Sequence, residues 1–62
     1  MKYQCTGNLH IWGWTDFKEA IHGNIVSYDA NCGVINSITY EVDGILDKKA
    51  CKEFGVDYVK IN

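Results

Sequence analysis

The residues best suited to metal or thiol chemistry are Cys5, Cys32, Cys51, His10 and His22. They include no C-x-x-C pair and no closely spaced histidines, whereas structural zinc sites bring their ligands in such pairs. A zinc site assembled from distant members of the set is the alternative. An odd, widely spaced set of cysteines is also atypical of disulfide-rich secreted domains. We therefore expect no metal cofactor, and three buried or half-buried thiols in a cytoplasmic protein; one disulfide with a leftover thiol is the alternative.

A second candidate for chemistry is the stretch DANCG, which places Asp29, Asn31 and Gly33 at alternate positions, as at the start of a calcium-binding loop. An EF-hand loop carries its glycine at position 6 and a glutamate at position 12. Here the glycine comes one place early, and position 12 is Tyr40 instead of Glu41. An Asx turn that closes a hairpin explains the same residues without an ion.

Catalytic spacing is also missing from the sequence. There is no glycine-rich phosphate loop, nucleophile elbow or paired-carboxylate motif. Asp29 could be combined with either histidine, or a cysteine with a histidine, but no spacing fixes such a pair. A chain of 62 residues also leaves little volume for a pocket of ~300 Å³ or more. We expect neither an enzyme nor a cofactor.

Composition and charge narrow the classes of partner. The chain is 47% hydrophobic and 23% charged, its net charge is −2, and its six basic residues are all lysines. Nucleic-acid-binding domains are usually basic and use arginine for bidentate contacts, so direct nucleic-acid binding is not expected. The sequence has no apolar run near 18 residues and no leader-like segment, so no membrane partner is expected.

The sequence pattern predicts one α+β domain over residues 1–62, with its strands and helices in the order ββαββαβ. We expect a mainly antiparallel sheet of about five strands with two short helices on one face. The turn at 6–8 predicts an N-terminal hairpin, and Gly13 argues against a helix over 9–14 because glycine costs about 1 kcal/mol inside a helix. Strands are expected at 2–5, 9–14, 24–29, 34–42 and 56–61, and helices at 16–22 and 47–54.

The alternate residues His10, Trp12 and Trp14 would then share one face of the second strand. If the tryptophans face the helices they are core residues, which is the arrangement that burial of their large area favours. If they face the open side of the sheet, they form a hot spot for a partner. The sequence leaves both arrangements open.

The function expected on these grounds is that of a small acidic cytoplasmic module that binds another protein. Such a module can act by steric occlusion or by nucleic-acid mimicry, and neither requires a chemical reaction. One form of it is an inhibitor of a nucleic-acid-binding host protein, encoded by a phage or mobile element. The rivals are a single-strand nucleic-acid binder that stacks bases on Trp12 and Trp14, and a homodimeric structural or regulatory module. We expect the binding surface on the open sheet face and a strand edge, with the following candidate residues: Trp12, Trp14, Ile35, Glu41, Asp43, Asp57 and Tyr58.

Overall fold

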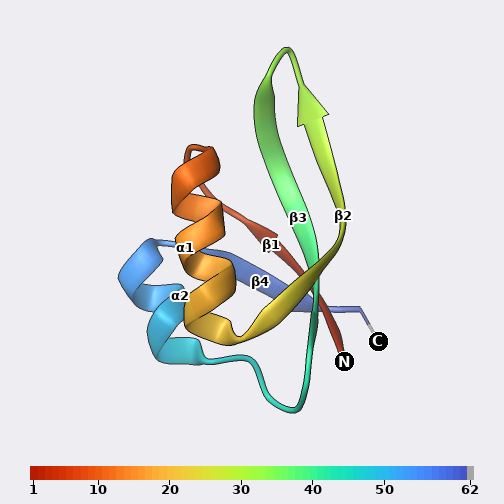
Figure 1. Ribbon diagram of the computed structural model, residues 1–62, viewed down its shortest axis with the longest axis vertical. Coiled ribbons are helices and arrows are strands. Elements are labelled where there is room, and N and C mark those ends of the chain that lie inside the picture. Colours follow the sequence, from red (N-terminus) through yellow and green to blue (C-terminus); the bar gives the residue numbers. More distant parts are fainter. Residues whose placement is uncertain (62) are drawn as a thin grey trace.

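Residues 1–61, the part of the chain that the computed structural model describes, form four strands and two helices. The strands form one antiparallel sheet in the order β2-β3-β1-β4, and both helices lie on the same face of it (Figure 1). The predicted α+β class is confirmed, but the order βαββαβ replaces ββαββαβ, and four strands replace about five. This is the split βαβ, or ferredoxin-like, arrangement. The elements are β1 (Lys2–Thr6), α1 (Ile11–Ile21), β2 (Gly23–Asn31), β3 (Val34–Val42), α2 (Lys48–Phe54) and β4 (Asp57–Lys60).

The difference arises at residues 9–14, which were predicted to be a strand and instead lead into and begin α1. His10 caps this helix, and its Nδ1 accepts a hydrogen bond from the backbone N–H of Gly13 at 3.3 Å. A Cβ at Gly13 would lie only 3.1 Å from the Cβ of Leu9. Gly13 therefore lets the preceding loop approach the first turn closely, and this contact offsets the helical cost of glycine that the prediction relied on.

The second helix begins and ends as predicted. Asp47 is the N-cap, and its Oδ1 accepts hydrogen bonds from the backbone N–H groups of Lys49 at 3.0 Å and Ala50 at 3.2 Å. Gly55 ends the helix in the left-handed region with φ 67°. The first helix ends in the same way at His22, with φ 53°. One residue, His22, separates α1 from β2, and two residues, Gly55 and Val56, separate α2 from β4.

The β2–β3 hairpin is the longest feature of the sheet, and its tip projects beyond the helices (Figure 1). Cys32 and Gly33 close it with φ angles of 53° and 80°, as a two-residue turn with both central residues at positive φ requires. Cys32 is exposed there, so the expectation of three buried or half-buried thiols is wrong for this residue.

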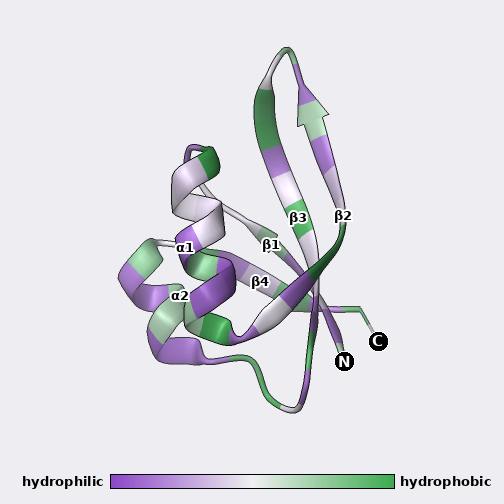
Figure 2. Cartoon of the chain, viewed as in Figure 1, coloured by the Kyte–Doolittle hydropathy of each residue, from purple (hydrophilic) through white to green (hydrophobic). Residues whose placement is uncertain are grey.

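The register between β2 and β3 shifts between Ile25 and Ser27 and again between Asp29 and Ala30. Hydrophobic residues continue along β3 into the projecting end (Figure 2).

The core lies between the sheet and the helices and is centred on Phe17. Its ring makes edge-to-face contacts with Trp14, Tyr40 and Phe54 at centroid distances of 6.1, 5.6 and 5.5 Å. The hydroxyl of Tyr40 donates a hydrogen bond to the carbonyl oxygen of Trp14 at 3.2 Å. Burial of these aromatic rings joins α1, α2 and β3 in one cluster.

The opposite face of the sheet is open and largely polar. Cross-strand partners share a face, and the registers place Gln4 with Thr39 and Thr6 with Ser37 on this side, away from the buried Cys5 and Tyr40. Gln4 Nε2 donates a hydrogen bond to Ser37 Oγ at 3.5 Å. Leu9, Ile11, Trp12 and Trp14 were predicted to lie on a strand of this sheet. They belong instead to α1 and its preceding loop, so the open face does not carry them.

Candidate functional site

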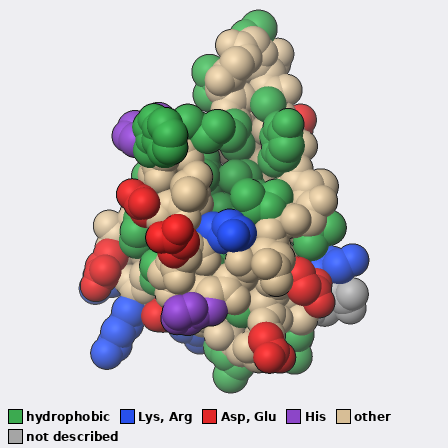
Figure 3. All heavy atoms as spheres, viewed as in Figure 1, with side chains coloured by type: hydrophobic (Ala, Val, Ile, Leu, Met, Phe, Trp, Pro, Cys, Tyr) green, Lys and Arg blue, Asp and Glu red, His purple; other side chains and the backbone are tan. Residues whose placement is uncertain are grey.

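An apolar groove of about 910 Å³ runs between the N-terminal part of α1 and the projecting hairpin, on the helix side of the sheet. The expectation that so small a domain would lack a pocket of this size is wrong. In Figure 3 hydrophobic side chains gather on both sides of a hollow in the upper half of the molecule. We call this feature the apolar groove and define it by its hydrophobic lining residues: Leu9, Ile11, Trp14, Ile25, Tyr28, Val34, Ile35 and Ile38.

One wall of the groove is the loop before α1 and the first turns of the helix. Ile11 and Thr15 are four residues apart, so they share one flank of the helix. The Thr15 hydroxyl donates to the carbonyl oxygen of Ile11 at 3.1 Å, so this polar group is satisfied within the helix. The indole of Trp14 forms the inner part of the wall and is only 1% exposed.

The other wall is the hairpin, because the pairing register turns its apolar residues toward the helices. Tyr28 pairs with Ile38, and Ala30 pairs with Ile35 after the irregularity at Asn36. That extra residue in β3 reverses the alternation, and it is the reason that Ile35 packs against the core side while Ser37 lies on the open face. The hairpin end is thus an apolar two-stranded arm with no helix above it (Figure 1).

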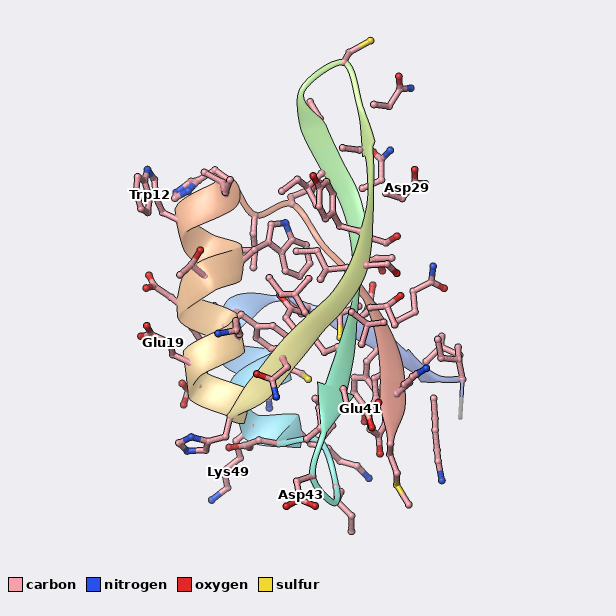
Figure 4. The ribbon with its side chains drawn as sticks, turned by 45° about the vertical axis from the view of Figure 1, so that its right-hand side comes forward. Trp12, Glu19, Asp29, Glu41, Asp43 and Lys49 are labelled. Atoms are coloured by element: carbon pink, nitrogen blue, oxygen red, sulfur yellow. The ribbon has the colours of Figure 1, made fainter. Side chains whose placement is uncertain are left out.

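Much of the apolar groove is exposed to solvent. Ile11 is 61% exposed and Tyr28 66%, and Ile25 and Val34 are also exposed. Trp12, on the same turn as Ile11, is 72% exposed and points outward from α1 (Figure 4). The largest apolar patch on a small protein is often functional.

The electrostatics of the groove favour uncharged ligands. No carboxylate and no lysine lines it within residues 1–61; His10, Asn8, Asn36 and Thr15 are its polar side chains. The Nε1 of Trp14 is buried without a hydrogen-bond partner among the described residues. An unpartnered buried donor costs roughly 1–3 kcal/mol, and an acceptor from a bound molecule that reached it would remove this cost.

The two buried thiols, Cys5 and Cys51, lie in the core and do not line the groove. Burial, with a smaller contribution from the neighbouring Cys51 thiol, raises the pKa of Cys5 from 9.0 to about 12. Burial and then the charge of Asp47 also raise the pKa of Cys51. Both thiols therefore stay protonated at neutral pH and pack as core groups. Within residues 1–61, no three histidine, cysteine, aspartate or glutamate side chains are grouped to hold a metal ion.

Of the seven residues predicted from the sequence, two line the groove. These are Ile35 and Trp14, the latter as a core residue, whereas Trp12 is exposed and points outward from α1 (Figure 4). The two tryptophans therefore do not share a surface, because one points into the core and the other away from it.

The other four predicted residues lie elsewhere. Glu41 is on β3, 3.5 Å from the N-terminal amine, and Asp43 is in the exposed loop after it, at the end of the molecule opposite Trp12 (Figure 4). Asp57 begins β4 and pairs with Thr6 on the open face. Tyr58 is on the helix side of the other sheet edge, in edge-to-face contact with Tyr3 at 6.4 Å. The acidic residues do not form one cluster with the apolar ones.

The sequence reasoning missed Leu9, Ile11, Ile25, Tyr28, Val34 and Ile38 as parts of one surface. The signal for α1 was present, since Trp14, Phe17 and Ile21 recur at helical spacing. With α1 extended back to Ile11, the apolar residues before Trp14 fall on a helix flank and no longer belong to a strand. The hairpin wall was not readable, because it depends on the register shift at Asn36.

No helix within residues 1–61 has the length and apolar character needed to cross a membrane. No protein-family model matches the chain, and comparisons with curated proteins and with solved structures give no significant match.

Proposed function

We propose that this chain is a small acidic protein-binding module that holds an apolar segment of a partner protein in the apolar groove. The observation that carries the proposal is the concentration of exposed apolar side chains around one hollow at one end of the molecule. Elsewhere the exposed apolar residues are single, such as Ile45 in the loop before α2, or belong to the short edge strand β4 and the residue after it, such as Val59 and Ile61. Isolated exposed residues need no explanation, whereas a contiguous patch around a concave surface does.

The shape of the groove supports a protein partner more than a small molecule. Its volume is in the range of ligand pockets, but its exposed walls, Ile11, Tyr28 and Val34, leave it open to a large neighbour. Sites for small molecules usually also hold a few convergent polar groups. Here polar side chains line part of the groove, but the exposed side chains of Ile11, Tyr28 and Val34 are apolar or aromatic, which suits a larger interface.

Binding in this way acts by occlusion, because the bound partner segment is covered and no reaction is needed. The net charge of −2 would favour association with a basic partner. A cytoplasmic inhibitor encoded by a phage or mobile element, directed at a host nucleic-acid-binding protein, is the form of this function that the size and acidity of the chain favour.

The alternative of single-strand nucleic-acid binding lacks its stacking platform. Trp14 is buried and Trp12 is on the outer side of α1. Tyr28 pairs with Ile38 and Tyr58 with Cys5, so these rings also face the helix side and leave the open sheet face without them. Tryptophan fluorescence titrated with an oligonucleotide at low salt tests this alternative; a saturable change at Trp12 would restore it.

The proposal is tested by affinity capture with matched variants. The bait is the full chain, in the wild-type form and as Ile11→Gln, Tyr28→Thr and Ile45→Gln. Ile45 is 81% exposed and does not line the groove, so Ile45→Gln makes the same change as Ile11→Gln at a remote site. We expect a protein that wild type and Ile45→Gln recover equally and that Ile11→Gln and Tyr28→Thr lose at least tenfold. Equal recovery by all four baits would place the binding surface elsewhere.

A further inference from the structure

The structure also indicates how a segment would enter the apolar groove. Resting on the proposed function, we propose that the segment is an extended stretch of the partner chain that adds to the outer edge of β2 as a fifth strand. β2 is an edge strand, since it pairs only with β3. Its outward backbone N–H and C=O groups are therefore available to another strand.

The two edges of the sheet differ in how they are protected against such pairing. β4 has four residues, begins with Asp57 and ends with Lys60, and short charged edge strands resist added strands. β2 has nine residues, GNIVSYDAN, with no lysine, arginine or proline and one charged residue, Asp29. The extra residue Val26 interrupts its inner half. The second shift, between Asp29 and Ala30, has its extra residue in β3, so residues 27–31 of β2 themselves contain no extra residue.

This stretch borders the apolar groove. A strand paired to 27–31 directs every second side chain to the helix side of the sheet. Tyr28 is on that side, because it pairs with the buried Ile38, and it lines the groove opposite Ile11. The helix-side side chains of the added strand would therefore lie beside Tyr28, next to the hairpin wall of the groove. The chemistry that fits them is apolar and uncharged.

The remaining side chains of the added strand would lie on the open face, next to Asp29. This carboxylate is exposed and points away from α1 beside the outer part of β2 (Figure 4). An opposite charge across a strand pair is favourable and a like charge is unfavourable. The segment that fits the edge thus alternates apolar residues with polar ones and carries a basic residue opposite Asp29.

The same charge argues against a second copy of this chain as the added strand. Antiparallel self-pairing over residues 27–31 has its two-fold centre at Asp29, which would place the carboxylates of two copies directly opposite each other. That arrangement is destabilising, whereas a lysine or arginine from a different chain removes the conflict.

The test uses a capped nine-residue peptide in which valine alternates with threonine around one central lysine, titrated into the isotope-labelled full chain. Backbone amide shifts are followed by NMR. We expect saturable shifts at residues 27–31 below about 1 mM. Two further peptides carry N-methyl groups on alternate backbone amides, one on each edge of the peptide. Because successive N–H groups of a strand point to opposite edges, one methylated peptide should bind like the parent and the other at least tenfold more weakly.

The protein variants separate this inference from the proposed function. Replacing the central lysine with glutamate should weaken binding roughly fivefold, and Asp29→Asn should abolish that difference. If Ile11→Gln lowers affinity but both methylated peptides bind like the parent, the groove is a binding site and strand addition is wrong. Absence of shifts at β2, or loss of binding by both methylated peptides, would also overturn strand addition. Shifts at β2 that depend on protein concentration alone would identify a second copy as the occupant, contrary to the inference.

Discussion

Single residues show how closely burial determines chemistry in this chain. The three cysteines take two roles: Cys5 and Cys51 are core groups, and Cys32 is exposed at the hairpin tip. Trp12 and Trp14 are two residues apart, yet one is 72% exposed and the other 1%. Because an α-helix has 3.6 residues per turn, side chains two positions apart point to different sides of it. The strand prediction placed both tryptophans on one face, because side chains two positions apart in a strand point to the same side of the sheet.

The thiols provide the first prediction. Cys32 should react with a thiol reagent in the native protein, whereas Cys5 and Cys51 should react only after unfolding, because burial raises the pKa of both and blocks access. Mass spectrometry should find one label per native chain and three in denaturant. A Cys32→Ser variant should take none in its native form. Rapid labelling of two or three thiols in the folded protein would contradict the buried pair.

The raised pKa of Cys5 gives the second prediction, the response of stability to alkaline pH. The thiol titrates near 9.0 in the unfolded chain and near 12 in the folded chain. Its contribution is therefore complete below pH 9.0 and is lost as pH rises toward 12. The free energy of unfolding should fall by up to about 1.4 kcal/mol per pH unit in this window. Urea unfolding should show a shallower fall for Cys5→Ala; an identical slope would mean that Cys5 does not cause it.

At the scale of elements, α2, β2, β3 and the last strand could be predicted from caps, turns and alternation. Asp47 and Gly55 are typical helix start and stop residues, and they act as such. The start of α1 could not be predicted in this way, because its cap is His10, which is not a favoured N-cap residue, and its first turn contains Gly13. Leu9 also lies so close to Gly13 that a Cβ there would be only 3.1 Å from the Cβ of Leu9, a local fit that the helix propensity of glycine does not reveal.

The weak cap of α1 gives the third prediction. His10→Asp should stabilise the protein by about 1 kcal/mol, because aspartate is a better N-cap and its charge complements the helix dipole. α1 has no acidic residue in its first turn that already supplies this effect. Urea unfolding measures the change, with Asp47→Ala expected to cost about 1 kcal/mol as the reciprocal control at α2. A loss of stability in His10→Asp would show that the imidazole contact with Gly13 is worth more than a standard cap.

Over the whole molecule, the helices cover one part of the sheet and leave the hairpin arm uncovered (Figure 1). The class and the one-sided helical layer follow from the pattern of elements. The strand order and the groove do not, since they depend on pairing between distant segments and on the extra residue Asn36 in β3. The predicted location of the binding surface, on the open sheet face, remains a prediction; of its apolar candidates, Trp14 and Ile35 line the groove, and Tyr58 lies at the other sheet edge.

The most direct test of the central claim is a hydrogen-exchange footprint of the chain in complex with the partner recovered by capture. Binding in the apolar groove predicts slower exchange in residues 9–15 and 27–35 on complex formation. It predicts unchanged exchange in α2 and β4, which lie outside the groove. Protection confined to residues 48–60, with the hairpin arm exchanging as in the free protein, would contradict the account.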